Sequence, residues 1–207
     1  MKKIMFSDAF GLTQAVLEGR KTMTRRIINI DNDELRGMQF RGINEDGLAI
    51  MRSSIGVSQL VPKYHTGEVV AVAQSYNDVY EELKRTHGSS SSITREFFHK
   101  YIQGGRMPVS NKMFVRADLM PNQIRITDIK VERLQDISDD DCIKEGVIEG
   151  KFRDFPNDMF YPYKDCKDHE VSWTAKGAFW KLIDKVSGKG TWERNPWVFA
   201  YSFELVK

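Results

Sequence analysis

Cysteine is scarce in this chain of 207 residues, and long apolar stretches are missing from it. Its two cysteines, Cys142 and Cys166, are too few for the disulfide framework of a small secreted protein. The start Met1-Lys2-Lys3 is typical of a signal peptide, but Ser7 and Asp8 interrupt the apolar run that should follow. No run approaches the ~18 apolar residues that can span a bilayer. We therefore expect a soluble, cytoplasmic protein with no membrane partner.

A strong net charge is missing as well. The sequence has 31 basic and 29 acidic residues, which give a formal net charge of +2. The overall electrostatic field therefore does not favour the binding of nucleic acid, and any basic binding site must be local. Hydrophobic residues make up 41% of the chain, which is too much for a disordered protein and ordinary for a globular one. The length predicts one elaborated domain or at most two small ones.

The densest charge lies in residues 18–26, which read EGRKTMTRR and contain four cations and two hydroxyls. Gly19 is suited to end a preceding helix, because glycine reaches the left-handed conformation without steric cost. The β-branched Thr22 and Thr24 and the isoleucines that follow favour extended chain. Cations at such a helix-to-strand corner can converge on an anion. The alternative is a solvated turn with ordinary surface charges, which is how charge runs usually behave.

Hydrophobic periodicity predicts both helices and strands. Apolar residues recur at helical spacing over 8–18 and 175–187, and Ser7 is suited to cap the first of these helices. A third, short helix over 138–145 is predicted by the capping residue Ser138 and by Asp139, Asp140 and Asp141 in its first turn. Strand-like runs occupy 22–28, 69–73, 123–134 and 197–205. The run 69–73 is apolar on both faces, which predicts a fully buried strand. Asp46-Gly47, between two further strand-like runs, predicts a hairpin.

Three stretches interrupt this regular pattern. Residues 77–104 predict two helices joined by a serine-rich linker, a helical hairpin inserted between strands. Residues 147–172 form a second, irregular insertion. Within strand 123–134 the apolar positions change phase between Ile126 and Ile129, which predicts a bend or bulge near Asp128.

The motif Gly19-Arg20-Lys21-Thr22-x-Thr24-x-Arg26 resembles the N-terminal signature of the ASCH-domain family, relatives of the PUA-like RNA-binding barrels. Further stretches resemble the longer bacterial and prophage members in the order of the family: 6–26, 66–72, 129–146, 188–192 and 195–198. The resemblance implies an α+β fold over a single domain, 1–207. Its core would be a small, mixed or antiparallel PUA-like β-barrel with helices around it.

The resemblance also implies where the protein binds its ligand. In the family, the basic segment lines a cleft between the barrel and the helices. The partner implied is therefore RNA or a modified nucleoside, bound by Arg20, Thr22, Arg25 and Arg26. Trp192, in a glycine-rich loop, is a candidate for an exposed platform on which a base stacks.

One small branch of the family removes the acetyl group from N4-acetylcytidine with a lysine, a threonine and a glutamate. Lys21 and Thr24 match the first two by motif, and Glu145 matches the third by its place at the end of helix 138–145. A lysine with a lowered pKa beside a hydroxyl is a known catalytic pairing, and neighbouring arginines are expected to lower that pKa. Either Thr24 attacks the amide or Lys21 activates a water. The alternative is a structural threonine beside a Lys–Glu ion pair.

This chain departs from that branch in three ways. Arg25 stands where the branch prefers an apolar residue, Ile27 stands where it prefers an acid, and the chain is about twice as long. Two non-catalytic functions therefore remain open: an RNA-binding module, and an interaction or accessory protein of a prophage or mobile element.

A metal site is not expected. Cys166-Lys167-Asp168-His169 superficially resembles a metal loop, but the sequence has no second cluster of cysteine and histidine to complete four ligands. We expect neither a metal nor an organic cofactor.

Overall fold

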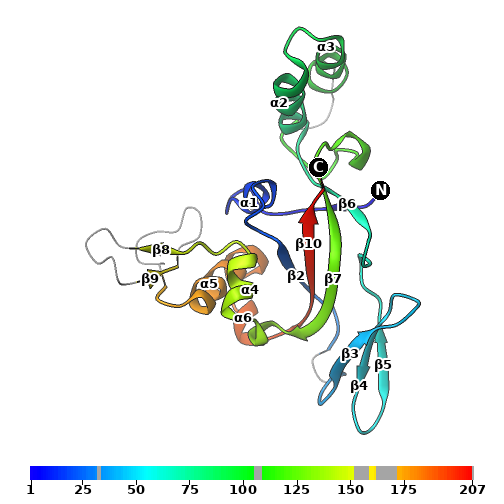
Figure 1. Ribbon diagram of the computed structural model, residues 1–207, viewed down its shortest axis with the longest axis vertical. Helices are drawn as coiled ribbons and strands as arrows, with labels where there is room; N and C mark the ends of the chain where they lie inside the picture. The colour runs from blue at the N-terminus through cyan, green and yellow to red at the C-terminus, as the bar shows by residue number, and fades with distance from the viewer. Residues whose placement is uncertain (32–33, 105–108, 152–158, 162–171, 207) are drawn as a thin grey trace. The chain divides into compact units, whose positions relative to one another are not determined.

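The computed structural model describes residues 1–31, 34–104, 109–151, 159–161 and 172–206, which form a mixed α+β fold (Figure 1). A five-stranded mixed sheet has the strand order β1-β6-β7-β10-β2. Its strands are β1 (Lys3–Ile4), β6 (Val69–Val72), β7 (Gln123–Arg133), β10 (Trp197–Leu205) and β2 (Met23–Ile27). Among the described residues no closed barrel is found, so barrel closure stays a prediction.

The chain divides into two compact units, of which the first combines Met1–Phe6, Val69–Ile124 and Leu205–Lys207. It contains the parallel pair β1–β6 and the helices α2 (Tyr76–His87) and α3 (Ser92–Phe97). The π-helix η1 (Phe98–Gln103) and the 3-10 helix η2 (Ala117–Leu119) complete this unit. Residues 70–73 are completely buried, which confirms the predicted buried strand.

The helical hairpin predicted over 77–104 is confirmed within the first unit. Ser75 begins α2 with a capping box, in which its hydroxyl accepts from Asp78 N and the Asp78 carboxylate accepts from Ser75 N. Tyr76 and Val79 of α2 pack with Phe97 of α3 in one apolar cluster. The serine-rich linker separates the two helices as the sequence predicts.

The second unit combines Ser7–Glu68 and Arg125–Glu204. Strand β2 pairs antiparallel with β10, so that Thr24 lies opposite Tyr201. Its helices are α1 (Leu12–Leu17), the 3-10 helix η3 (Leu134–Asp136), α4 (Asp139–Lys144), α5 (Ala175–Ser187) and α6 (Thr191–Arg194). A separate antiparallel sheet contains β3 (Gln39–Ile43), β4 (Ala49–Arg52) and β5 (Val57–Leu60), which confirms the hairpin predicted at Asp46-Gly47.

The start predicted for the first helix is wrong. The helix was expected over 8–18 with Ser7 as its cap, but α1 begins at Leu12. Residues 8–11 form turns instead, in which Gly11 N donates to Asp8 O and Leu12 N donates to Ser7 O. Gly11 has φ 64°, a left-handed conformation that separates these turns from the helix.

The phase change predicted in strand 123–134 is visible in the burial of β7. Ile124 and Ile126 are buried before it, and Ile129 and Val131 are buried after it. The two positions between them, 127 and 128, are both exposed. The ribbon of β7 is curved in Figure 1, and one strand thus contributes apolar side chains in both phases.

The irregular insertion predicted over 147–172 lies mostly outside the described residues. Its described part includes the short antiparallel pair β8 (Gly150–Lys151) and β9 (Met159–Phe160).

Candidate functional site

The basic segment folds against the end of α4. Gly19 has φ 73°, as predicted, and the backbone N–H groups of Arg20 and Lys21 both donate to one α1 carbonyl at 2.9 Å. The next backbone amide, of Thr22, donates to the carbonyl of Lys144 in the last turn of α4 at 3.0 Å. Strand β2 therefore begins directly at the C-terminal end of α4, where side chains of the two elements meet.

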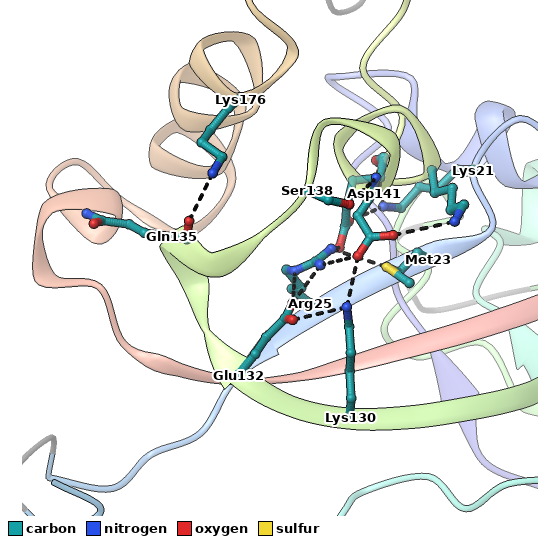
Figure 2. Close-up of polar contacts among 11 residues, drawn as sticks. Lys21, Met23, Arg25, Lys130, Glu132, Gln135, Ser138, Asp141 and Lys176 are labelled. Carbon is teal, nitrogen blue, oxygen red and sulfur yellow. Dashed lines mark hydrogen bonds and ion pairs between the residues drawn. The ribbon is translucent and has the colours of Figure 1, made fainter. Parts of the chain in front are cut away.

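Arg25 lies at the centre of a buried cluster of ion pairs (Figure 2). Its guanidinium nitrogens lie 2.6 Å from Glu132, 2.9 Å from Asp141 and 3.2 Å from Glu145. Its side chain is only 1% exposed. Glu132 belongs to β7, whereas Asp141 and Glu145 belong to α4 and its C-terminal cap. The Arg25 side chain therefore joins β2 to β7 and to α4 within the second unit.

Lys21 ends in the same cluster. Its Nζ donates to Glu145 Oε2 at 2.6 Å and to the backbone carbonyl of Glu145 at 2.6 Å. The two side chains are 2% and 6% exposed. Because Glu145 caps α4, the ammonium also lies at the helix end that carries partial negative charge. Lys21 and Glu145 are 124 positions apart in the sequence, so only the tertiary fold brings them together.

Lys130 and Lys144 form the exposed side of the cluster. Lys130 Nζ lies 3.0 Å from Asp141 Oδ2 and 3.0 Å from Glu132 Oε2, and Lys144 Nζ lies 3.5 Å from Asp141 Oδ1. Their side chains are 36% and 51% exposed, far more than that of Arg25. The cluster is therefore more exposed at these two lysines than at Arg25.

Burial lowers the pKa of Lys21 below its usual value, because the charged ammonium is removed from water. Glu145 opposes this by raising the pKa, and the positive charges of Arg26 and Arg25 lower it further. The expected lowering is therefore present, but its main cause is burial rather than the neighbouring arginines.

Asp141 behaves in the opposite way. Burial acts to raise its pKa, but hydrogen bonds from Lys130 and Arg25 outweigh burial and hold the pKa below its usual value. Burial also acts to lower the pKa of Arg25, and the charges of Glu145 and Glu132 reverse that effect. The cluster thus contains ionised partners that stabilise one another.

Thr24 lies on the face of β2 opposite to Arg25, because successive side chains of a strand alternate. Arg25 shares its face with Met23, whose Sδ accepts from the guanidinium at 3.2 Å, whereas Thr24 shares the other face with Tyr201. Thr24 is 5% exposed. In the described part of the chain no hydrogen bond joins its hydroxyl to Lys21 or Glu145. The fold thus brings two of the three expected catalytic residues together.

The residues expected to bind RNA are dispersed. Arg20 is exposed and pairs with Glu18 at 2.5 Å, whereas Thr22 is half-buried. Arg26 is half-buried opposite Phe199 of β10. The expectation that Arg25 contacts RNA needs correction, because its guanidinium is buried among carboxylates instead of facing solvent.

Sequence reasoning missed Lys130, Glu132 and Asp141. Asp141 was assigned only to the first turn of a helix, where acids favour the helix dipole. Lys130 and Glu132 alternate along β7 with the buried Ile129 and Val131. A Lys-x-Glu pair that alternates with core residues in a central strand was therefore the available signal.

Trp192 lies in the short helix α6, where a glycine-rich loop was expected. Its indole is half-buried and stacks on Trp180, with ring centroids 6.4 Å apart. It is therefore not the freely exposed platform that the sequence predicts. Trp197, by contrast, is 7% exposed in β10 and belongs to the core.

Neither a metal centre nor a membrane span is found in the described part of the chain. No group of three or more His, Cys, Asp or Glu side chains there is arranged to hold a metal ion. The loop with Cys166 and His169 lies outside the described residues. No helix among those described is long and apolar enough to cross a membrane.

No family model, curated protein or solved structure matches this chain. The resemblance of residues 19–26 to the ASCH signature therefore stays an expectation. The geometry around Lys21, and the chemistry that this geometry allows, are the basis on which a function can be proposed.

Proposed function

We propose that the protein hydrolyses the acyl amide of an acylated nucleobase, such as that of N4-acetylcytidine, with Lys21 as the general base. The observation that supports this proposal is the 2.6 Å contact between Lys21 Nζ and Glu145 Oε2. Glu145 was selected as the partner of Lys21 by family resemblance, from a helix more than a hundred residues away. A positioned carboxylate beside a lysine with a lowered pKa is an arrangement suited to acid–base catalysis.

The proposed reaction transfers one proton through Lys21. Neutral Lys21 Nζ takes a proton from water, and the water oxygen bonds to the amide carbon. The lysine ammonium then gives its proton to N4 as the C–N bond breaks, which yields the free amine and acetic acid, and the acid ionises to acetate by releasing a proton to water. Glu145 holds Nζ in position in both steps, and Lys130, on the exposed side of the cluster, is the cation available to the oxyanion.

Attack by water fits this geometry better than attack by Thr24. The hydroxyl of Thr24 lies on the opposite face of β2 from the cluster, so Lys21 is poorly placed to deprotonate it. We therefore assign Thr24 no nucleophilic role. This is a departure from the role that the family resemblance implies.

The test is acetate release from N4-acetylcytidine. Lys21→Arg is the sharpest variant, because the guanidinium keeps a positive charge near Glu145 but is not deprotonated in proteins. We expect Lys21→Arg and Lys21→Ala to lose activity and Thr24→Ala to retain it. Glu145→Gln should reduce the rate with a changed pH profile, since the lysine loses its ionised partner. Circular dichroism of each variant separates lost chemistry from lost folding.

Two results would overturn this proposal. One is a folded parent protein that releases no acetate above background. The other is a folded Lys21→Arg protein with the rate of the parent.

The second candidate is a non-catalytic RNA-binding module. It is favoured by the saturation of Lys21, whose side chain is 2% exposed and which bonds to two oxygens of Glu145. Arg20 and Arg26 would then bind the RNA backbone. Changing both to Gln should weaken binding and flatten its salt dependence, by about 0.7 in the slope for each phosphate of a single strand that is no longer neutralised.

A further inference from the structure

The surface formed by α5 and α6 carries a tryptophan that the proposed hydrolysis does not use. Trp180 of α5 is 41% exposed. Its ring stacks on Trp192 of α6, with the ring planes 24° apart. Trp192 in turn meets the buried Phe179 edge-on, with the two ring centroids 6.3 Å apart. The inner side of the Trp180 indole is therefore packed against the protein, and much of the ring faces solvent.

Asp184 joins the two helices that carry these rings. Its carboxylate accepts from the backbone amides of Gly190 at 3.0 Å and Trp192 at 2.8 Å, which ties α6 to α5. Burial acts to raise the pKa of Asp184, and these hydrogen bonds lower it below its usual value. A ring fixed in this way loses little conformational freedom when a ligand stacks on it.

The segment that contains these two helices is rich in basic residues. Residues 172–195 contain five cations, Lys176, Lys181, Lys185, Lys189 and Arg194, and two acids, Asp184 and Glu193. Their net charge of +3, five minus two, exceeds the +2 of the whole chain. Lys176 precedes Trp180 by four residues, but its Nζ donates to the backbone carbonyl of Gln135 at 3.3 Å, so it is not assigned to the ligand. Lys189 is exposed in the turn between the two helices.

We propose that the α5–α6 surface binds single-stranded nucleic acid, with one base stacked on Trp180 and a neighbouring phosphate beside Lys189. Proteins that bind single strands combine an aromatic ring for the base with cations for the backbone, and this surface has both. A second copy of the chain is a poorer occupant, because two surfaces of charge +3 repel each other. The proposal is independent of hydrolysis at Lys21.

The first test is fluorescence anisotropy of a labelled oligouridylate titrated with the full chain. Trp180→Ala should weaken binding by about 5- to 150-fold, the range that corresponds to ~1–3 kcal/mol of stacking per base. Val186→Ala is the matched control, since Val186 lies on the same helix and is 42% exposed but has no ring. It should bind as the parent does. Lys189→Gln should reduce the salt slope by about 0.7, the value for one phosphate on a single strand.

Further variants keep the test decisive. Trp180→Phe retains a smaller ring and should lose less affinity than Trp180→Ala, which gives a readout if the alanine variant does not fold. A parent that binds the oligouridylate but releases no acetate from N4-acetylcytidine would support this proposal and contradict the hydrolysis, so the two can fail separately.

Three results would overturn the proposal. The first is a parent protein that does not bind the oligouridylate, and the second is a set of folded Trp180 variants that bind it with the affinity of the parent. The third is a parent protein that self-associates through Trp180 and does not bind RNA. Sedimentation of the free protein reports the third.

Discussion

Two regions of this protein pair the same kinds of charges in different surroundings. On α2, Lys84 pairs with Glu81 and Arg85 with Glu82 across one helical turn, and the Arg85 side chain is 75% exposed. Around Arg25, which is 1% exposed, the partners come from distant parts of the sequence. Exposed pairs on one helix stabilise a protein little, because water and salt screen them. Buried pairs between distant segments determine which segments can meet, because an unpaired buried charge is costly.

The largest expected effect is that of Arg25→Met. The substitution leaves Glu132, Asp141 and Glu145 without their shared guanidinium in a buried site. We expect the free energy of unfolding to fall by ~3–5 kcal/mol, the usual cost of removing one partner from a buried ion pair. Urea denaturation followed by circular dichroism measures this change.

Lys84→Met on α2 is the matched control for Arg25→Met. It also removes one cation from an ion pair, but the pair is local and its two side chains are 32% and 65% exposed. We expect no measurable shift in its urea midpoint. Equal losses in the two variants would contradict the distinction between the two regions.

An intermediate effect is expected where glycines end two helices. Gly146 follows α4 with φ 107°, and an added Cβ would lie 3.0 Å from Leu12 Cδ2 and 3.7 Å from Lys21 Cδ. Gly188 follows α5 with φ 99° and has nothing within 4 Å of such a Cβ. Both alanine substitutions should cost ~1–3 kcal/mol from backbone strain, and Gly146→Ala should cost more because the added Cβ also crowds the Leu12 side chain. Thermal denaturation of the two variants checks this order, which equal losses would refute.

The smallest expected effect is a difference in how the pKa values of two carboxyl groups respond to salt. A hydrogen bond from Arg85 lowers the pKa of Glu82, whereas that of Asp141 is lowered by Lys130 and Arg25 against burial. At ~1 M salt the screening length is about 3 Å, so the pKa of Glu82 should return toward its usual value while that of Asp141 stays low. Carbon-13 NMR titration measures both, and equal salt responses would contradict the prediction.

The sign of the Asp141 contribution to stability follows from this shift. Its folded pKa lies below the unfolded value, so the unfolded state binds its proton at a higher pH. Asp141 therefore stabilises the fold above the unfolded pKa, and this contribution is lost as the pH falls through the folded pKa.

The elements that sequence predicts well are those specified by local pattern. Helix 175–187 was predicted at the bounds of α5, because its apolar spacing is regular and Thr174 caps it. The start of α1 could not be placed in the same way, since Gly11 takes a left-handed conformation that competes with helix formation. The pattern at 69–73 sufficed because a central strand is apolar on both faces.

The candidate site was predictable only in part. The motif selected Lys21, and Glu145 followed from the place of a helix end. The burial of Arg25 could not be predicted from sequence, because it depends on ion pairs with Glu132 and Asp141. The sequence around these two acids does not indicate that they contact β2. Thr24 was misplaced because a motif records the order of residues and not the alternation of faces in a strand.

The position of β2 at the edge of the sheet also determines when it can fold. Its strand neighbour is β10, and the carboxylates described around Arg25 follow it by more than a hundred residues. During synthesis from the N-terminus, Lys21 and Arg25 therefore emerge long before the residues that bury them. Contacts of such long sequence separation close slowly, because loop closure costs entropy before any contact repays it. The second unit should accordingly complete its folding late, once β10 has been synthesised.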